Sequence, residues 1–193
     1  DGTGGLPAFG ANDGAGDLVM SVGTTLTAPN GTIDVSGENV TLGGVTSGTA
    51  LTVTNNVDAD ADGTITLTGD LRGDGGVTIT AAEAGTAKLD IDLQGDISIT
   101  AIDNAISITT TNADHDIDGA FALNINAGTG AITLPAIGDN TAVESLTVAN
   151  SGAGTITLNG NISAQQDIAF THEGDVILGG DVTITSNDGA ATM

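Results

Sequence analysis

The phrase G-T-I-T-L-T-G-D-L at residues 63–71 returns almost letter for letter as G-T-I-T-L-N-G-N-I at residues 154–162. In both copies small polar residues alternate with Ile or Leu, and the alternation stops at Gly. This is the pattern of a short, half-buried strand closed by a turn. Ile65 and Leu67 are expected on one face of the first strand and the Thr residues on the other. A chain written in one repeated strand phrase is expected to be a stack of strands.

Looser copies of the phrase run through most of the chain. The alternation predicts strands at residues 18–22, 32–35, 39–42, 50–54, 64–68, 77–80, 87–93, 96–101, 105–109, 121–125, 131–134, 145–148, 155–158, 167–171, 175–178 and 181–185. We expect three parts: a Gly-rich N-terminal arm or loop over 1–17, one domain over 18–186, and a C-terminal tail or continuation into a longer chain over 187–193.

The near absence of aromatic residues separates two all-β architectures. Tandem immunoglobulin-like β-sandwiches are one alternative, but such domains fill their centres with large rings, whereas this chain has no Trp, no Tyr and only three Phe. A β-solenoid needs only a thin core of Ile, Leu, Val and Ala, with Gly at its corners. The sequence therefore favours a β-solenoid with coils of about 20 to 25 residues.

Charge excludes several functions. The chain has 25 acidic residues against Arg72 and Lys88, a net charge of -23, so neither nucleic acid nor an anionic membrane surface is an expected partner. No apolar run approaches the ~18 residues of a membrane span. Enzymes acting on polysaccharides need converging basic groups or carboxylates beside aromatic sugar platforms. We therefore expect a protein that is not an enzyme, with no catalytic and no cofactor-binding residues.

The segments T-I-T-L-N-G-N-I-S-A-Q-Q-D-I-A-F-T at 155–171 and G-D-V-I-L-G-G-D-V-T-I-T-S at 174–186 resemble repeats of large bacterial surface proteins, namely the filamentous haemagglutinins and autotransporter passengers. The resemblance implies a right-handed parallel β-helix that is secreted to the cell surface and used in adhesion, matrix or filament building. A solenoid also exposes strand edges at its ends unless they are capped. We expect self-association into a homopolymer, or membership of a larger surface protein, as a filament, sheath or matrix element. The alternative is an adhesin segment with calcium-stiffened turns that binds carbohydrate or a host surface.

Two acidic motifs are candidate metal sites. Both read D-x-D-x-D-G, and alternate carboxylates can converge on Ca²⁺ with Gly allowing a sharp turn. An EF-hand is rejected because Gly69 and Ile125 occupy the place of its final Glu. A calcium site completed by backbone carbonyls or a neighbouring coil, and Asp-rich turns exposed to solvent, both stay open. The candidate calcium ligands are Asp58, Asp60, Asp62, Asp114, Asp116 and Asp118.

Three other features are predicted to be structural. Arg72-Gly73-Asp74 spells an integrin-binding tripeptide but is too short to indicate recognition. His115 and His172 are expected at the surface. Flat faces of regularly spaced Thr-x-Thr pairs resemble those of ice-binding solenoids, but the pairs here begin at residues 52, 64, 78, 155 and 183. Such irregular spacing predicts no ordered ladder and argues against ice binding.

Overall fold

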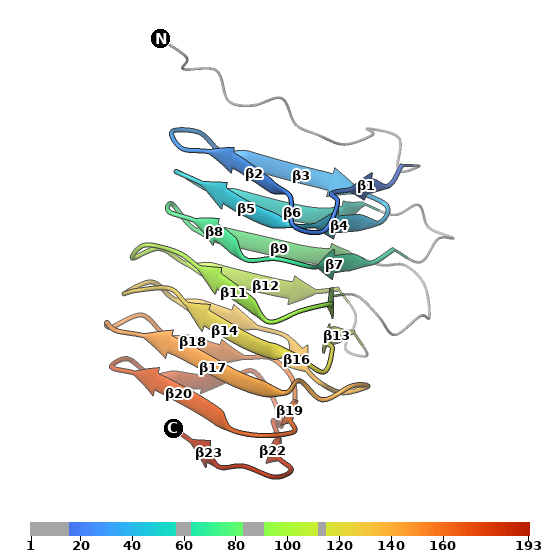
Figure 1. Ribbon diagram of the computed structural model, residues 1–193. Helices are drawn as coiled ribbons and strands as arrows, with labels where there is room; N and C mark the ends of the chain where they lie inside the picture. Colours follow the sequence, from blue (N-terminus) through green and yellow to red (C-terminus); the bar gives the residue numbers. More distant parts are fainter. Residues whose placement is uncertain (1–15, 57–62, 83–90, 112–114) are drawn as a thin grey trace.

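The chain winds into a right-handed β-solenoid in which three parallel sheets surround one core (Figure 1). The computed structural model describes residues 16–56, 63–82, 91–111 and 115–193. Within these residues there is no helix, and each coil contributes one strand to each sheet in turn. Figure 1 shows the path along the axis, with the second-sheet strands in front and the third-sheet strands behind.

In the described part of the chain, the three sheets hold eight, eight and seven strands. The first sheet contains β1 Leu18–Val19, β4 Val40–Leu42, β7 Ile65–Leu67, β10 Ile91–Leu93, β13 Asp116–Asp118, β16 Ala136–Ile137, β19 Ile162–Ala164 and β22 Ile184–Ser186. The second contains β2 Thr25–Ala28, β5 Gly44–Ser47, β8 Leu71–Gly73, β11 Ile97–Thr100, β14 Ala122–Asn126, β17 Ser145–Asn150, β20 Ile168–His172 and β23 Ala191–Thr192. The third contains β3 Ile33–Gly37, β6 Leu51–Asn56, β9 Val77–Ala82, β12 Ile106–Thr110, β15 Ile132–Leu134, β18 Ile156–Leu158 and β21 Val176–Leu178.

Every strand pairing among the described residues is parallel, so the immunoglobulin-like alternative, which requires antiparallel sheets, is wrong. In the first sheet the coil length runs from 20 residues, between the partners Ile117 and Ile137, to 26, between Ile65 and Ile91. The variation does not disturb the register, because it is absorbed in the corners between strands. β23 lies within the segment 187–193, and it pairs with β20.

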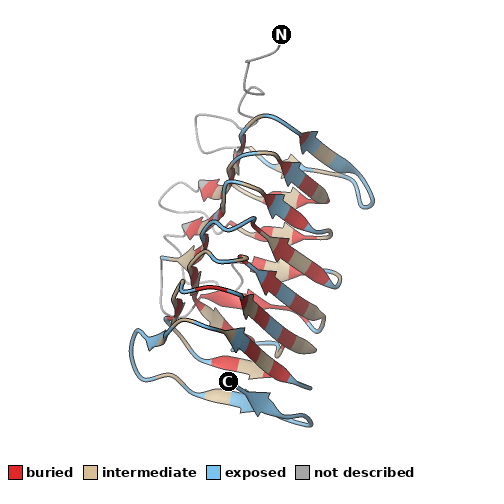
Figure 2. Ribbon diagram, turned by 90° about the vertical axis from the view of Figure 1, so that its left-hand side faces the viewer, coloured by how far each residue is buried: buried red, intermediate tan, exposed pale blue. Residues whose placement is uncertain are grey.

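The core is a continuous aliphatic column. Ile65, Leu67, Ile156 and Leu158 are all fully buried, which confirms that the repeated phrase directs its Ile and Leu side chains inward. Each of the two strands has buried ends and a half-buried middle residue, as strand alternation requires. Phe170 is the one aromatic residue in the buried core of the described chain. Figure 2 shows buried positions recurring along the strands of the middle coils.

The outward face of the third sheet carries an ordered hydroxyl ladder, so the prediction from spacing was wrong. Two rows run along the axis in register: Thr52, Thr78, Ser107, Thr133 and Thr157 form one, and Ser36, Thr54, Thr80 and Thr109 form the other. Insertions at the corners change the distance between strands along the chain. They leave the strands themselves stacked.

Candidate functional site

The second acidic motif places two carboxyl groups in an unusual position. Asp116 and Asp118 lie on either side of Ile117 in β13, and because Ile117 points into the core, both acids project from the opposite face. Even so, they are only 1% and 2% exposed. An outward position that is nevertheless buried requires a cover from another part of the chain.

That cover is the turn formed by residues 138–141 after β16, which we call the strap. The backbone N–H of Asp139 donates to Oδ2 of Asp116 at 2.5 Å, and the N–H of Thr141 donates to Oδ1 of Asp118 at 2.8 Å. The side-chain amide of Asn140 makes a longer contact of 3.5 Å with Oδ1 of Asp116. Each of the two backbone N–H groups thus binds a different carboxylate, and such a donor favours the ionised form of its carboxylate.

The backbone of the strap is anchored to the same strand. The N–H of Gly138 donates to the carbonyl of Ile117 at 2.8 Å, and Gly138 has a positive φ of 74° that favours glycine. A Cβ atom at this position would stand 2.3 Å from the carbonyl oxygen of Ser163. The sequence G-D-N-T at residues 138–141 is therefore typical of a turn, but it does not predict that the turn folds back over β13.

The buried pair carries an unbalanced charge. The pKa of Asp116 is raised from 3.8 to about 7, chiefly by burial and also by the charge and hydrogen bonding of Asp118 and the charge of Asp139, whereas the N–H of Asp139 lowers it. Among the described residues, the buried Oδ2 of Asp118 has no hydrogen-bond partner.

Calcium binding by Asp116 and Asp118, the described half of the motif, stays a prediction. Ca²⁺ takes six to eight oxygen ligands, and three of the four carboxylate oxygens of these two residues accept N–H groups from the strap. The described residues contain no group of three or more His, Cys, Asp or Glu side chains suited to a metal. Asp58, Asp60, Asp62 and Asp114 lie outside the described residues. For them calcium binding stays a prediction.

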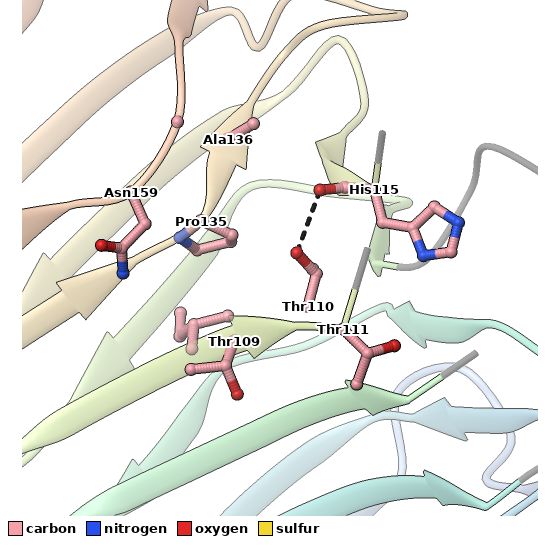
Figure 3. Close-up of a pocket in the computed structure, with 9 residues that line it drawn as sticks. Thr109, Thr110, Thr111, His115, Pro135, Ala136 and Asn159 are labelled. Carbon is pink, nitrogen blue, oxygen red and sulfur yellow. Dashed lines mark hydrogen bonds between the residues drawn. The ribbon is translucent and has the colours of Figure 1, made fainter. Parts of the chain in front are cut away.

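His115 is 1% exposed, so the expectation of a surface residue was wrong for this histidine. Its backbone carbonyl accepts a hydrogen bond from the Thr110 hydroxyl at 3.1 Å. Both residues line a pocket of about 170 Å³ at the corner between the third and first sheets. Figure 3 shows Thr109, Pro135 and Asn159 around this pocket, with the His115 ring turned away from Pro135. The pocket is smaller than the ~300 to 1,000 Å³ of ordinary small-molecule sites.

Arg72 and Asp74 of the R-G-D tripeptide bind each other. Arg72 lies on β8, and its Nε stands 2.6 Å from Oδ1 of Asp74. The hydrogen bond and the charge of Asp74 raise the pKa of Arg72. The two charged side chains of the tripeptide thus pair with each other, which is consistent with the predicted structural role.

The chain matches no protein-family model, no curated protein and no solved structure. Within the described residues no helix has the length and apolar character needed to cross a membrane.

Proposed function

We propose that the chain is a non-catalytic, extracellular building block of a bacterial surface filament, sheath or matrix, extended by adding coils at its ends. The β-solenoid fold and the likeness to repeats of bacterial surface proteins support this proposal. The observation that carries it is that both ends of the described solenoid leave core residues open to solvent.

The last coils show this at the C-terminal end. Val176 and Leu178 of β21 stand in register with Ile156 and Leu158 of β18, which are fully buried. Yet Leu178 is 52% exposed, because no further strand lies against β21 in the third sheet. Figure 2 shows the C-terminal coil in the exposed and intermediate colours, whereas the strands of the coils before it carry buried positions. Burying apolar side chains of this size contributes about 1.5 to 3 kcal/mol each.

The first coil shows the same feature. Leu18, Met20, Leu26 and Val35 line an apolar hollow of about 320 Å³ at the N-terminal end of the described solenoid. Val19, beside them, is 69% exposed. Both ends of the described solenoid thus present apolar side chains, framed by strand edges that pair with no other described strand.

The occupant we assign to these ends is a second copy of the chain. A first coil set against a last coil would continue three parallel sheets, reproducing the contact that each coil makes with the next inside the chain. Such a head-to-tail contact does not close on itself and generates a filament. The sides of the solenoid are less suited to self-association than its ends, since a net charge of -23 opposes lateral association.

Electron microscopy and sedimentation of the purified chain test this proposal. We expect fibres that lengthen with protein concentration, and we expect Leu178→Glu to suppress them. Ile102→Glu is the matched control, because Ile102 is 49% exposed but lies in the corner after β11 rather than at an end. A monodisperse short rod at every concentration, or equal loss of fibres in both variants, would overturn it.

The hydroxyl ladder favours a second candidate function, binding to an ice surface. Neighbouring strands set its hydroxyls about 4.7 to 4.9 Å apart along the axis, and positions two residues apart are separated by about 6.6 Å along a strand. Ice presents oxygen atoms in a fixed lattice, which a rigid two-dimensional hydroxyl array can match. Thr80→Tyr would break the array, whereas Thr100→Tyr on the second sheet would leave it intact. Inhibition of ice recrystallisation by wild type and T100Y, but not T80Y, is the expected result, and no inhibition by wild type would reject this candidate.

A further inference from the structure

The third sheet of the described solenoid has an open place where two copies would join end to end. Along the chain each third-sheet strand is followed by the first-sheet strand of the next coil, as β3 is followed by β4 and β21 by β22 (Figure 1). Among the described strands, β1 has no third-sheet strand before it and β23 has none after it. When a last coil meets a first coil, these two open places become one, between β21 of one copy and β3 of the next.

The chain enters β1 from this open place. The carbonyl of Gly16, the first described residue, accepts the N–H of Glu38 at 2.9 Å. The N–H of Leu18 donates to the carbonyl of Asn39 at 2.8 Å. Glu38 and Asn39 come directly after β3, so the chain at Gly16 lies beside the C-terminal end of that strand. Because β3 pairs only with β6 among the described strands, its other edge is available to residues 1–15.

The spacing inside the solenoid shows which part of residues 1–15 has the right distance from β1. We count from the first inward residue of each third-sheet strand to the first-sheet residue that shares the register column of Leu18. This distance runs from 5 to 14 residues, and its extremes are Ile132 to Ile137 and Leu51 to Ile65. Counting the same distances back from Leu18 gives a strand that starts within residues 4–13.

Two segments in this range carry apolar residues in alternation, L-P-A at 6–8 and F-G-A at 9–11. Pro7 has no N–H to donate, which disfavours the first segment between two neighbouring strands. The second segment has the three-residue length of β15, β18 and β21. The apolar hollow at the first coil, of about 320 Å³, has room for an aromatic ring. The segment 9–11 therefore fits the open place better.

We propose that residues 9–11 of one copy form the strand that completes the third sheet between two copies, pairing with β3 of their own copy and with β21 of the preceding one. This inference rests on the proposed function and names the segment that makes the contact between copies. Continuous register sets Phe9 between Ile33 and Val176. The added strand covers Leu178, which is 52% exposed in the single chain.

Sedimentation of fibres formed by the whole chain and its variants tests the inference. Phe9→Asp should raise the protein concentration needed for fibres at least about tenfold, because the contact between copies loses a large buried apolar side chain. Thr3→Asp is the matched control, since it adds the same charge outside residues 4–13 and should leave fibre formation unchanged. Removing residues 1–13 should abolish fibres, although it removes two acidic residues and so lowers the repulsion between copies.

The outcomes separate this inference from the proposed function. Equal fibre formation by wild type, F9D and the shortened chain would overturn the added strand and leave end-to-end assembly standing. An absence of fibres from the wild type at every concentration would overturn the proposed function itself, and the added strand with it. Thermal melting shows whether each variant keeps the fold.

A disulfide between copies tests the register without relying on a destabilising variant, since the chain has no Cys. The inferred register sets Gly10 beside Ile177 of the preceding copy, at the ~4.8 Å between neighbouring strands that a disulfide can bridge. Gly10→Cys combined with Ile177→Cys should therefore give covalent multimers under mild oxidation.

The matched control combines Gly10→Cys with Thr157→Cys. Thr157 is the register partner of Ile177 on β18, one strand farther from the added strand, at about twice the strand spacing and beyond the reach of a disulfide. Multimers should form with the first pair and not with the second. Fibres that give no multimers with the first pair, or equal amounts with both, would overturn the inferred register.

Discussion

The side-chain amide of Asn150 donates to the backbone carbonyl of Gly130 on the preceding coil at 2.6 Å. It also donates to the carbonyl of Gly154 at 2.9 Å, and its own oxygen accepts the N–H of Gly152 at 2.9 Å. Asn150 is only 1% exposed, so one buried side chain satisfies backbone groups at the corner after β17 and joins it to the coil before. The corner is therefore held by specific polar contacts as well as by its glycines.

Asn150→Ala should lower the free energy of unfolding by about 2 to 4 kcal/mol, because it leaves buried backbone groups without partners. Chemical denaturation measures this loss. The matched control is Asn124→Ala, at an exposed position of β14, which should change stability by less than about 0.5 kcal/mol. Equal effects of the two variants would contradict the role assigned to Asn150.

Gly130→Ala should destabilise the chain by about 1 to 3 kcal/mol through steric overlap. A Cβ atom at Gly130 would stand 2.1 Å from the backbone carbonyl oxygen of Asn104 on the coil before it. At Gly95 an added Cβ would meet no atom within 4 Å, so Gly95→Ala should be neutral or stabilising by up to about 1 kcal/mol. Thermal melting of the pair checks the prediction, which fails if G130A melts at or above the temperature of G95A.

Ile106→Ala should cost about 2 to 5 kcal/mol. Ile106 is fully buried in β12 and stands in register between Val77 and Ile132, so the cavity would interrupt the aliphatic column. Its neighbour Ser107 points outward, and Ser107→Ala should stay within about 0.5 kcal/mol. Denaturant titration of both variants separates inward from outward positions, and a larger loss in S107A would contradict the observed alternation.

Filament growth should depend on salt, if the ends join copies as proposed. Copies with a net charge of -23 repel one another, and this repulsion is screened over about 8 Å at physiological ionic strength. We expect light scattering at a fixed protein concentration to rise from low to physiological salt. Growth that is fastest without salt would instead indicate an attractive charge contact at the ends.

Strands rich in Ile, Leu and Thr could be predicted from the sequence, but several of the strands that pair with one another in the sheets could not. These strands lay outside the predicted ranges because they are short or contain Gly or charged residues: β2, β5, β8, β13, β16, β19 and β23. Leu71–Gly73 has the sequence L-R-G, which shows little strand propensity by itself. It is a strand because Val45 of β5 and Ile99 of β11 pair with Leu71 from the two neighbouring coils.

The sequence by itself determined the alternation of inward aliphatic and outward polar residues, and with it the thin core without large rings. This follows from side-chain chemistry and a period of two, which are local properties. Tertiary structure alone decided which residues meet between coils. Thr54 stands beside Thr80, and Asp139 covers Asp116, because corners of unequal length bring distant positions into register, and those lengths have no local signature in the residues that meet.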